Sequence, residues 1–185
     1  IPALMAVGAV HHHLIRAGKR MQASLIVESG EPREVHHIAA LLGYGAAAVY
    51  PYLALESVAA MRFKEPGLTP AVALQRYRKA AEDGLLKVMS RMGISTLDSY
   101  TGAQVFEAVG LDDEIIDLCF PGTPSPVRGS GFAQIAQVVL AWHAKAYPTP
   151  GKLETYGFFK PRKGGEHHDF TPETAKKLHE AVGLG

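Results

Sequence analysis

The spacing of apolar residues predicts that helices make up most of the chain. Between residues 1 and 17, apolar side chains recur every three or four positions, as on one face of a helix. Thr69 is placed to cap a long helix over 70–92, in which Gly84 costs about 1 kcal/mol relative to alanine and marks a candidate break. Similar spacing and flanking breakers predict further helices over 33–42, 52–63, 102–109, 112–118, 131–146 and 172–183.

Three short apolar runs predict β-strands, over 23–28, 46–50 and 93–97. Strands that alternate with helices indicate a parallel sheet covered by helices. Three strands are too few for a closed barrel, which takes eight. Proline and glycine predict an irregular loop over 120–131 and an extended arm over 147–168. The pattern therefore predicts an α/β fold: a partial parallel β/α domain, then a helical segment and a connecting arm.

Composition and charge limit the partners. The 185 residues carry 19 Lys and Arg against 18 Asp and Glu, a net charge of +1, which argues against nucleic acid or an acidic membrane as partner. The uncharged opening over 1–10 is shorter than the roughly 20 residues that span a bilayer, and no basic region precedes it. Because the chain starts at Ile1 rather than Met, we expect a piece of a longer polypeptide or a processed chain.

The single cysteine, Cys119, excludes an internal disulfide and any zinc or iron–sulfur site built from this chain's thiolates alone. Its apolar neighbours predict a buried structural thiol, and one cysteine suits a reducing compartment. Seven of the nine histidines form the runs His11-His12-His13, His36-His37 and His167-His168. Adjacent helical residues diverge in direction, so we expect these histidines to make structural hydrogen bonds; a metal site built from separate runs remains the alternative.

Two glycine-containing loops have some features of phosphate-binding sites. Gly43-Tyr44-Gly45 lies between a helix and a strand, the reverse of the dinucleotide-binding order. Arg128-Gly129-Ser130-Gly131 precedes a predicted helix N-terminus, a position able to bind an anion, but it lacks a preceding predicted strand and the lysine of a P-loop. We interpret both as structural loops.

The best-placed polar residues are Glu28, Ser29 and Glu31, at the turn after the first predicted strand. In parallel α/β folds, active sites form at this end of the sheet. His36 and His37 lie on the helix that the turn starts. The alternative is that these residues only form the turn, cap the helix and pack.

Several longer stretches resemble the large chain of glutamate synthase, and the resemblance runs from Ile1 to about Val182. Tyr50, Thr101 and Pro126 depart from the residues usual in that family. The matching stretches are His11-His12-His13-Leu14-Ile15-Arg16, Leu25-Ile26-Val27-Glu28-Ser29-Gly30-Glu31, Arg33-Glu34-Val35-His36-His37, Gly43-Tyr44-Gly45-Ala46, Pro51-Tyr52-Leu53-Ala54, Gly84-Leu85-Leu86-Lys87-Val88-Met89-Ser90, Met92-Gly93-Ile94-Ser95-Thr96, Ser99-Tyr100, Gly102-Ala103-Gln104, Phe106-Glu107-Ala108 and Gly165-Glu166-His167-His168 with Pro172-Glu173.

The resemblance implies an enzyme that makes two glutamates from glutamine and 2-oxoglutarate. It implies an amidotransferase domain that releases ammonia and a flavin mononucleotide barrel with an iron–sulfur cluster. A central domain, similar to an incomplete TIM barrel, joins them and helps to enclose the ammonia path. Residues 1–146 resemble the second half of this central domain, and 147–185 the arm and first helix leading to the flavin barrel.

The resemblance assigns no catalytic, cofactor-binding or metal-binding residue to this chain, which we expect to be inactive alone. Glu28, Ser29, Glu31, His36 and His37 become candidates for the interdomain path or for coupling. The implied partners are the amidotransferase and flavin domains of one polypeptide, with ferredoxin or an electron-donating small subunit. The implied location is the cytoplasm or the plastid stroma. A stand-alone scaffold of the same fold is the alternative.

Overall fold

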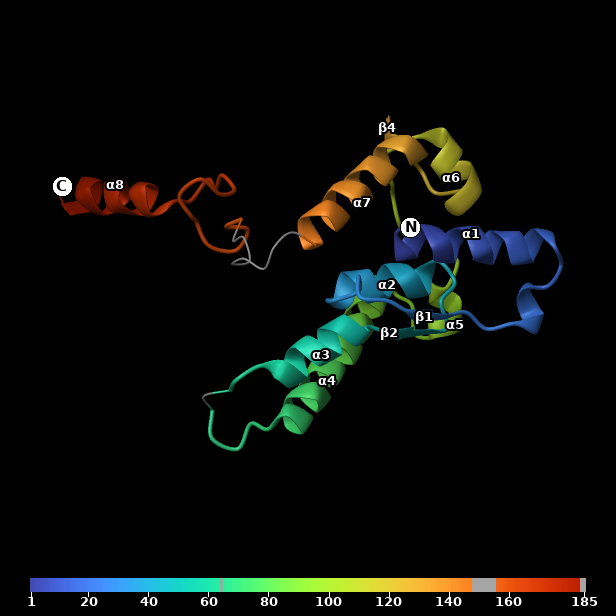
Figure 1. The fold of residues 1–185 in the computed structure, drawn as a ribbon, viewed down its shortest axis with the longest axis horizontal. Coiled ribbons are helices and arrows are strands. Elements are labelled where there is room, and N and C mark those ends of the chain that lie inside the picture. Colours follow the sequence, from blue (N-terminus) through green and yellow to red (C-terminus); the bar gives the residue numbers. More distant parts are fainter. Residues whose placement is uncertain (64, 148–155, 184–185) are drawn as a thin grey trace. The chain divides into compact units, whose positions relative to one another are not determined.

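The computed structural model describes residues 1–63, 65–147 and 156–183, which form a mostly helical α/β structure. The chain divides into two compact units, Ile1–Ala141 and Trp142–Gly185. The elements of the first unit, which Figure 1 labels, are α1 (Ala3–Arg16), the 3₁₀ turn η1 (Arg20–Gln22), β1 (Ile26–Glu28), α2 (Val35–Gly43), β2 (Ala48–Tyr50), α3 (Tyr52–Ala60), α4 (Pro70–Arg91), α5 (Leu97–Tyr100), β3 (Val109–Leu111), α6 (Asp113–Cys119), β4 (Val127–Ser130) and most of α7 (Phe132–Ala146). The second unit holds the end of α7 and α8 (Pro172–Gly183).

The strands form two separate parallel pairs rather than one sheet. In the first pair, β1 lies beside β2 with Ile26 opposite Ala48 and Glu28 opposite Tyr50. In the second pair, β3 lies beside β4, with an irregular register between Val109 and Leu111. The prediction of parallel strands is confirmed, whereas a single three-stranded sheet is wrong, and no barrel forms within the described residues.

The predicted third strand at 93–97 is a turn followed by the short helix α5. Gly93 takes a positive φ of 70°, and the Ile94 amide donates to the Met89 carbonyl at 3.0 Å, so this segment closes the end of α4 instead of extending as a strand. Of its residues only Ile94 packs against the first apolar core, and the other four are exposed. A short apolar run does not distinguish these two outcomes.

Two further predictions between residues 102 and 131 are also wrong. The stretch expected to be a helix over 102–109 is irregular, with Gly102 and Gln104 at positive φ, and ends in β3. The stretch expected to be an irregular loop over 120–131 contains β4. The two errors have one cause, because β3 and β4 stabilise each other only as a pair, and neither has a strand pattern of its own.

The remaining helices are confirmed, with shifts of a few residues at their ends. Asp112 caps α6 by accepting from the Asp113 amide at 2.8 Å, and Thr69 caps α4 by accepting from the Val72 amide at 3.3 Å. Of the predicted arm over 147–168, residues 148–155 lie outside the described part. Within the described residues, no helix is both long and apolar enough to cross a membrane.

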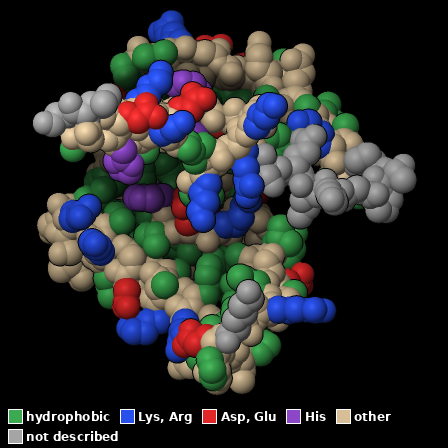
Figure 2. Space-filling view, turned by 90° about the vertical axis from the view of Figure 1, so that its left-hand side faces the viewer, with side chains coloured by type: hydrophobic (Ala, Val, Ile, Leu, Met, Phe, Trp, Pro, Cys, Tyr) green, Lys and Arg blue, Asp and Glu red, His purple; other side chains and the backbone are tan. Residues whose placement is uncertain are grey.

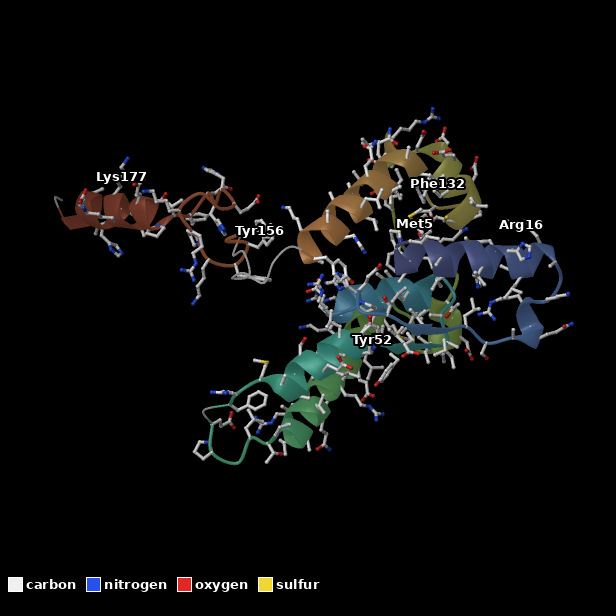
Figure 3. All side chains as sticks on the ribbon, in the orientation of Figure 1. Met5, Arg16, Tyr52, Phe132, Tyr156 and Lys177 are labelled. Carbon is white, nitrogen blue, oxygen red and sulfur yellow. The ribbon has the colours of Figure 1, made fainter. Side chains whose placement is uncertain are left out.

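Two apolar cores lie on different sides of α1. Val7 belongs to the first, with β1, α2 and the fully buried Tyr100. Met5, labelled in Figure 3, belongs to the second, with Ile115 and other residues of α6. Leu4 packs against both cores, so one helix joins the β1–β2 part of the unit to the β3–β4 part.

Gly8 allows α1 to approach the end of α6 closely. A Cβ at Gly8 would lie 2.1 Å from the backbone oxygen of Cys119, a distance that real Cβ atoms do not reach. Because a backbone carbonyl cannot rotate away as a side chain can, any larger residue would displace one of the two helices.

Gly84 also marks a close approach and does not break α4, which is continuous from Pro70 to Arg91. A Cβ there would lie 2.3 Å from Cγ2 of Val35, at the first turn of α2. Val35 is β-branched and stiff, so it has little freedom to yield. The glycine is thus a packing residue, and its cost in helix propensity is offset by the contact between α2 and α4.

We expect Gly84→Ala to lower the free energy of unfolding by about 1 kcal/mol, because overpacking of about 1–3 kcal/mol outweighs a propensity gain of about 1 kcal/mol. Urea denaturation of the single variant, of Val35→Ala and of the double variant measures this. The loss caused by Gly84→Ala should be smaller in the Val35→Ala background. A Gly84→Ala chain that is more stable than wild type would contradict the packing role.

Candidate functional site

Glu28 and Ser29 lie at the carboxyl end of β1, where the sequence places them. Glu28 stands opposite Tyr50, and the Ser29 amide donates to the Tyr50 carbonyl at 3.2 Å. The Glu28 side chain is exposed and that of Ser29 is half-buried. Next to them, a Cβ on Gly30 would lie 3.2 Å from the hydroxyl of Tyr52, the first residue of α3 (Figure 3). The turn after β1 therefore packs against the start of α3.

Glu31 caps a different helix from the one expected. Its carboxylate Oε2 accepts from the backbone amide of Ala3 at 2.8 Å, so it satisfies a free donor at the N-terminus of α1. The negative charge also complements the positive end of that helix. Its own amide donates to the Ser29 hydroxyl at 3.1 Å, which closes the turn. The alternative to a functional role was that this turn caps the following helix, α2; Glu31 does cap a helix, but that helix is α1.

The two histidines of this region do not join the turn into one site. Nδ1 of His37 accepts from the Arg33 amide at 3.2 Å, and its Nε2 lies 3.7 Å from the Glu34 carboxylate. His36 is exposed on the first turn of α2. Among the described residues, no hydrogen bond connects His36 or His37 to Glu28 or Glu31. The turn and the histidines are neighbours along the chain, but each makes local contacts of its own.

Two hollows flank the β1–β2 pair. One of about 340 Å³ runs along β1, from Leu25 to Ser29, and has α1 as its other wall. One of about 480 Å³ runs along β2, from Ala47 to Tyr50, between α2 and α4. Most of their lining side chains are apolar. Glu28 and Ser29 therefore border a groove, but it lacks the converging polar groups that fix a charged substrate.

Arg20 forms a three-way connection that sequence reasoning missed. Its guanidinium donates to Nδ1 of His11 at 2.9 Å, to the Gly45 carbonyl at 2.9 Å and to the Ala23 carbonyl at 2.7 Å. Gly45, at a φ of 114°, brings the backbone so close that a Cβ would lie 2.2 Å from the same ring nitrogen. The bonds hold the second half of α1 against the turn before β2. The glycine in the helix-to-strand turn was the only signal of this contact in the sequence.

Of the histidine run on α1, His11 makes the expected structural hydrogen bond and His12 packs against its ring, whereas His13 is exposed. His11 accepts the arginine bond, and its ring lies edge-on to that of His12, with centroids 5.1 Å apart. Partial burial, followed by the charge of Arg20 and then of His12, lowers the pKa of His11 below its usual value of 6.5. Burial and then Arg16 lower the pKa of His12 in the same direction. Both rings are thus held in the neutral form to lower pH than free imidazoles.

The other candidate positions also have structural partners. At the start of α7, the Phe132 amide donates to the Glu114 carboxylate at 3.0 Å, and the Gly131 amide donates to the Gln134 side chain at 3.1 Å. Arg128 pairs with Asp113 at 2.9 Å. An acidic side chain therefore already occupies this helix N-terminus. The interpretation of 128–131 as a loop is wrong, because 128–130 belong to β4, which leads directly into α7.

Cys119 is buried in the second core, and burial raises the pKa of its thiol. A thiol in this state is a poor nucleophile and a poor metal ligand.

His168 contacts the Gly157 carbonyl through Nε2 at 2.5 Å. Within the described part of the chain, no three or more His, Cys, Asp and Glu side chains gather in a group suited to a metal ion. Figure 2 shows Lys and Arg as well as Asp and Glu side chains on the visible face.

Comparison with known proteins identifies the family of this chain. The family model described as the glutamate synthase central domain matches residues 1–112. A ferredoxin-dependent glutamate synthase 2 from Synechocystis sp. is 49% identical over 98% of this chain. This chain belongs to the glutamate synthase central domain family. The NADH glutamate synthase of Schizosaccharomyces pombe and the ferredoxin-dependent glutamate synthase 1 of Arabidopsis thaliana are each 45% identical over the same share.

The chain spans only a small part of these glutamate synthases. It covers 12% of the Synechocystis protein, 9% of the fission yeast protein and 12% of the Arabidopsis protein. The similarity therefore identifies a segment of a large polypeptide and extends beyond the 1–112 match to nearly the whole chain.

The segment's own residues do not fit the cofactors that the resemblance implies for the whole enzyme. An iron–sulfur cluster takes several thiolates, and this sequence has one cysteine, which is buried. A flavin phosphate needs free donors such as a helix N-terminus, and the N-terminus of α7, which follows the glycines at 129 and 131, already binds the Glu114 carboxylate.

The low pKa of His11 and His12 predicts a stability that falls in mild acid. The unfolded chain takes up protons near the ordinary pKa of about 6.5, whereas the folded chain resists protonation until lower pH. The free energy of unfolding should therefore be highest above pH 7 and decrease as the pH falls through 6.5. Urea denaturation between pH 5 and pH 8, roughly the range of imidazole titration, measures the slope.

We expect His11→Gln to reduce this slope, because glutamine accepts the Arg20 bond without titrating. His13→Gln, on the exposed side of the same helix, is the matched control. An unchanged slope in His11→Gln would show that the titration of His11 is not its cause.

Proposed function

We propose that this chain is the central connecting segment of a glutamate synthase, the oxidoreductase that forms two glutamates from glutamine and 2-oxoglutarate. The observation that carries the proposal is identity of 45–49% over 98% of the chain to enzymes named ferredoxin-dependent and NADH glutamate synthases. Residues 1–146 form the second half of the central domain, and 147–185 lead into the flavin barrel. The strand-and-helix units of the segment are part of an incomplete barrel that the rest of the polypeptide extends.

In this proposal the chemistry takes place in other domains. An amidotransferase domain of the same polypeptide releases ammonia, and a flavin mononucleotide barrel with an iron–sulfur cluster reduces the imine formed from ammonia and 2-oxoglutarate. Ferredoxin, or an electron-donating small subunit, supplies electrons away from this segment. The enzyme acts in the cytoplasm or in the plastid stroma. We expect the chain alone to be inactive, because these reactions take place in the other domains.

The segment's part is to enclose the route that neutral ammonia takes and to couple the two sites. Glu28 and Ser29 border the groove between β1 and α1, whose walls are mostly apolar. Apolar walls do not trap a neutral molecule by strong hydrogen bonds, and they disfavour its conversion to ammonium. Glu31, through its bond to Ala3, fixes the turn at the mouth of that groove.

The proposal separates residues that hold the fold from residues that couple the reactions. Glu28 and His36 are exposed, and neither caps a helix among the described residues. Glu28→Gln and His36→Ala should therefore leave the free energy of unfolding near that of wild type. In the full-length enzyme they should let glutamine hydrolysis run ahead of glutamate formation. Glu31→Gln is the control for a structural loss, because it weakens a helix cap worth about 0.5–2 kcal/mol.

The test measures glutaminase and glutamate synthase rates in the same samples, together with thermal unfolding. A hydrolysis-to-synthesis ratio that stays at the wild-type value in both Glu28→Gln and His36→Ala would eliminate the coupling role of this turn and its helix. A full-length protein that makes no glutamate from glutamine and 2-oxoglutarate would overturn the proposed function itself.

A further inference from the structure

The hydroxyl of Tyr100 is buried in the first core without a protein partner. The residue is 0% exposed, and none of the described residues forms a hydrogen bond with its hydroxyl. The two residues that follow it are well paired. The Thr101 hydroxyl donates to the Leu42 carbonyl at 3.1 Å, and the Gly102 amide donates to the Gly43 carbonyl at 2.9 Å. Buried polar groups in native proteins are nearly always hydrogen-bonded, so this hydroxyl needs an explanation.

Packing alone does not explain the hydroxyl. The ring of Tyr100 lies edge-on to that of Phe106, with centroids 6.2 Å apart, and its backbone amide donates to the Thr96 carbonyl at 3.3 Å. A phenylalanine would make the same ring contact without burying an unpaired polar atom, which is costly. The polar atom is therefore the feature of this side chain that the apolar core does not use.

The first core adjoins both hollows of the β1–β2 pair. Val7 and Val27 are buried members of this core and also line the hollow along β1. Leu42 is a buried member that lines the hollow of about 480 Å³ along β2. Leu97, which precedes Tyr100 by about one turn on α5, lines the same hollow. The hydroxyl is thus held in a core whose side chains form the walls of two open spaces.

The surroundings of the hydroxyl determine which ligand it can bind. The oxygen is closely covered, so a ligand has to be very small. Met89, 4% exposed in the same core, has an unbranched and adaptable side chain that can shift to admit it. An isolated charge is far more costly to bury among apolar side chains than a neutral molecule, so an ion is excluded.

The hydroxyl acts as a donor over a wide pH range. Burial raises the pKa of Tyr100 above its usual value of 10, so the phenol keeps its proton. A ligand therefore needs a lone pair to accept this proton. Water and neutral ammonia both have one, whereas the ammonium ion does not.

We propose that the Tyr100 hydroxyl is a binding site for one small neutral molecule, water or ammonia, which enters from the hollow along β2. The molecule accepts from the hydroxyl and directs its other hydrogen bonds toward the hollow. The site itself is inferred from the buried hydroxyl and the hollow beside its core. Only its use by ammonia rests on the proposed function, in which ammonia passes through this part of the enzyme.

Crystal structures of the full-length enzyme and of Tyr100→Phe test the site directly. The wild-type structure should show one ordered molecule at about 2.7 Å from the hydroxyl oxygen of Tyr100, the usual length of an O–H···O bond. The molecule should be missing from Tyr100→Phe. A wild-type hydroxyl that bonds to a protein group, or to nothing, would overturn the inference.

Thermal unfolding of the same full-length proteins provides a second test. Tyr44→Phe is the matched control, because its hydroxyl bonds that of Thr123 at 2.7 Å. If Tyr100 binds a molecule, both variants should unfold at or below the wild-type temperature, since each loses a hydrogen bond. An unfolding temperature of Tyr100→Phe above that of wild type would show that the hydroxyl is unpaired, and would contradict the proposal.

Fluorine NMR distinguishes ammonia from water. The residue 3-fluorotyrosine replaces Tyr100 in the full-length enzyme, and in a control it replaces Tyr147, which is 76% exposed. Its resonance is compared with and without added ammonia at one alkaline pH. A shift at position 100 alone identifies ammonia as a ligand, and an unchanged resonance identifies the molecule in the crystal as water. None of these readouts uses activity, so a failure here is distinct from a failure of glutamate synthesis.

Discussion

The fold of the first unit depends on α1 lying between two apolar cores at very short range. Gly8 makes this possible, because it leaves room for the Cys119 carbonyl where any Cβ would collide. Leu4 contributes to both cores, and Figure 1 shows α1 between α2 and α6. Two polar contacts then fix the ends of the helix. Glu31 binds its first amide, and Arg20 binds His11 near its last turns.

This arrangement explains how a segment with two small strand pairs keeps a defined shape. Two-stranded pairs are marginal when alone, and these pairs share no hydrogen bonds with each other in the described residues. They are held together through α1 and through Tyr44, whose hydroxyl bonds Thr123 at 2.7 Å and whose ring stacks on Phe106 with centroids 5.4 Å apart. Side chains that could take part in catalysis also stabilise the fold here. Glu114 and Asp112 cap helices, and Cys119 packs in the second core.

The sequence predicted what depends on local pattern and missed what depends on distant partners. Helical spacing located α1, α4 and α7, and the cap at Thr69 was readable because its partner lies three residues away. The apolar run at 93–97 was misread because a helix end and a strand share that pattern. Val127, in β4, is a strand residue only because β3 lies beside it.

The candidate site followed the same rule. The turn from Glu28 to Glu31 was placed correctly, since strand-to-turn order is local. The partner of the Glu31 carboxylate is the Ala3 amide, 28 residues away, and no pattern in the sequence predicts this contact. The Arg20 contacts with His11 and Gly45 were hidden for the same reason.

We propose that this segment holds a glutamate synthase together without contributing catalytic groups. The most direct measurement is made on Gly8→Ala in the full-length enzyme, with Gly183→Ala as control because a Cβ there meets nothing within 4 Å. Three rates are compared: glutamine hydrolysis, glutamate formation from added ammonia, and glutamate formation from glutamine. If the segment only connects the two sites, Gly8→Ala should retain the first two rates, lose much of the third and release ammonia into the medium. Loss of either separate reaction, or an unchanged glutamine-dependent rate, would contradict it.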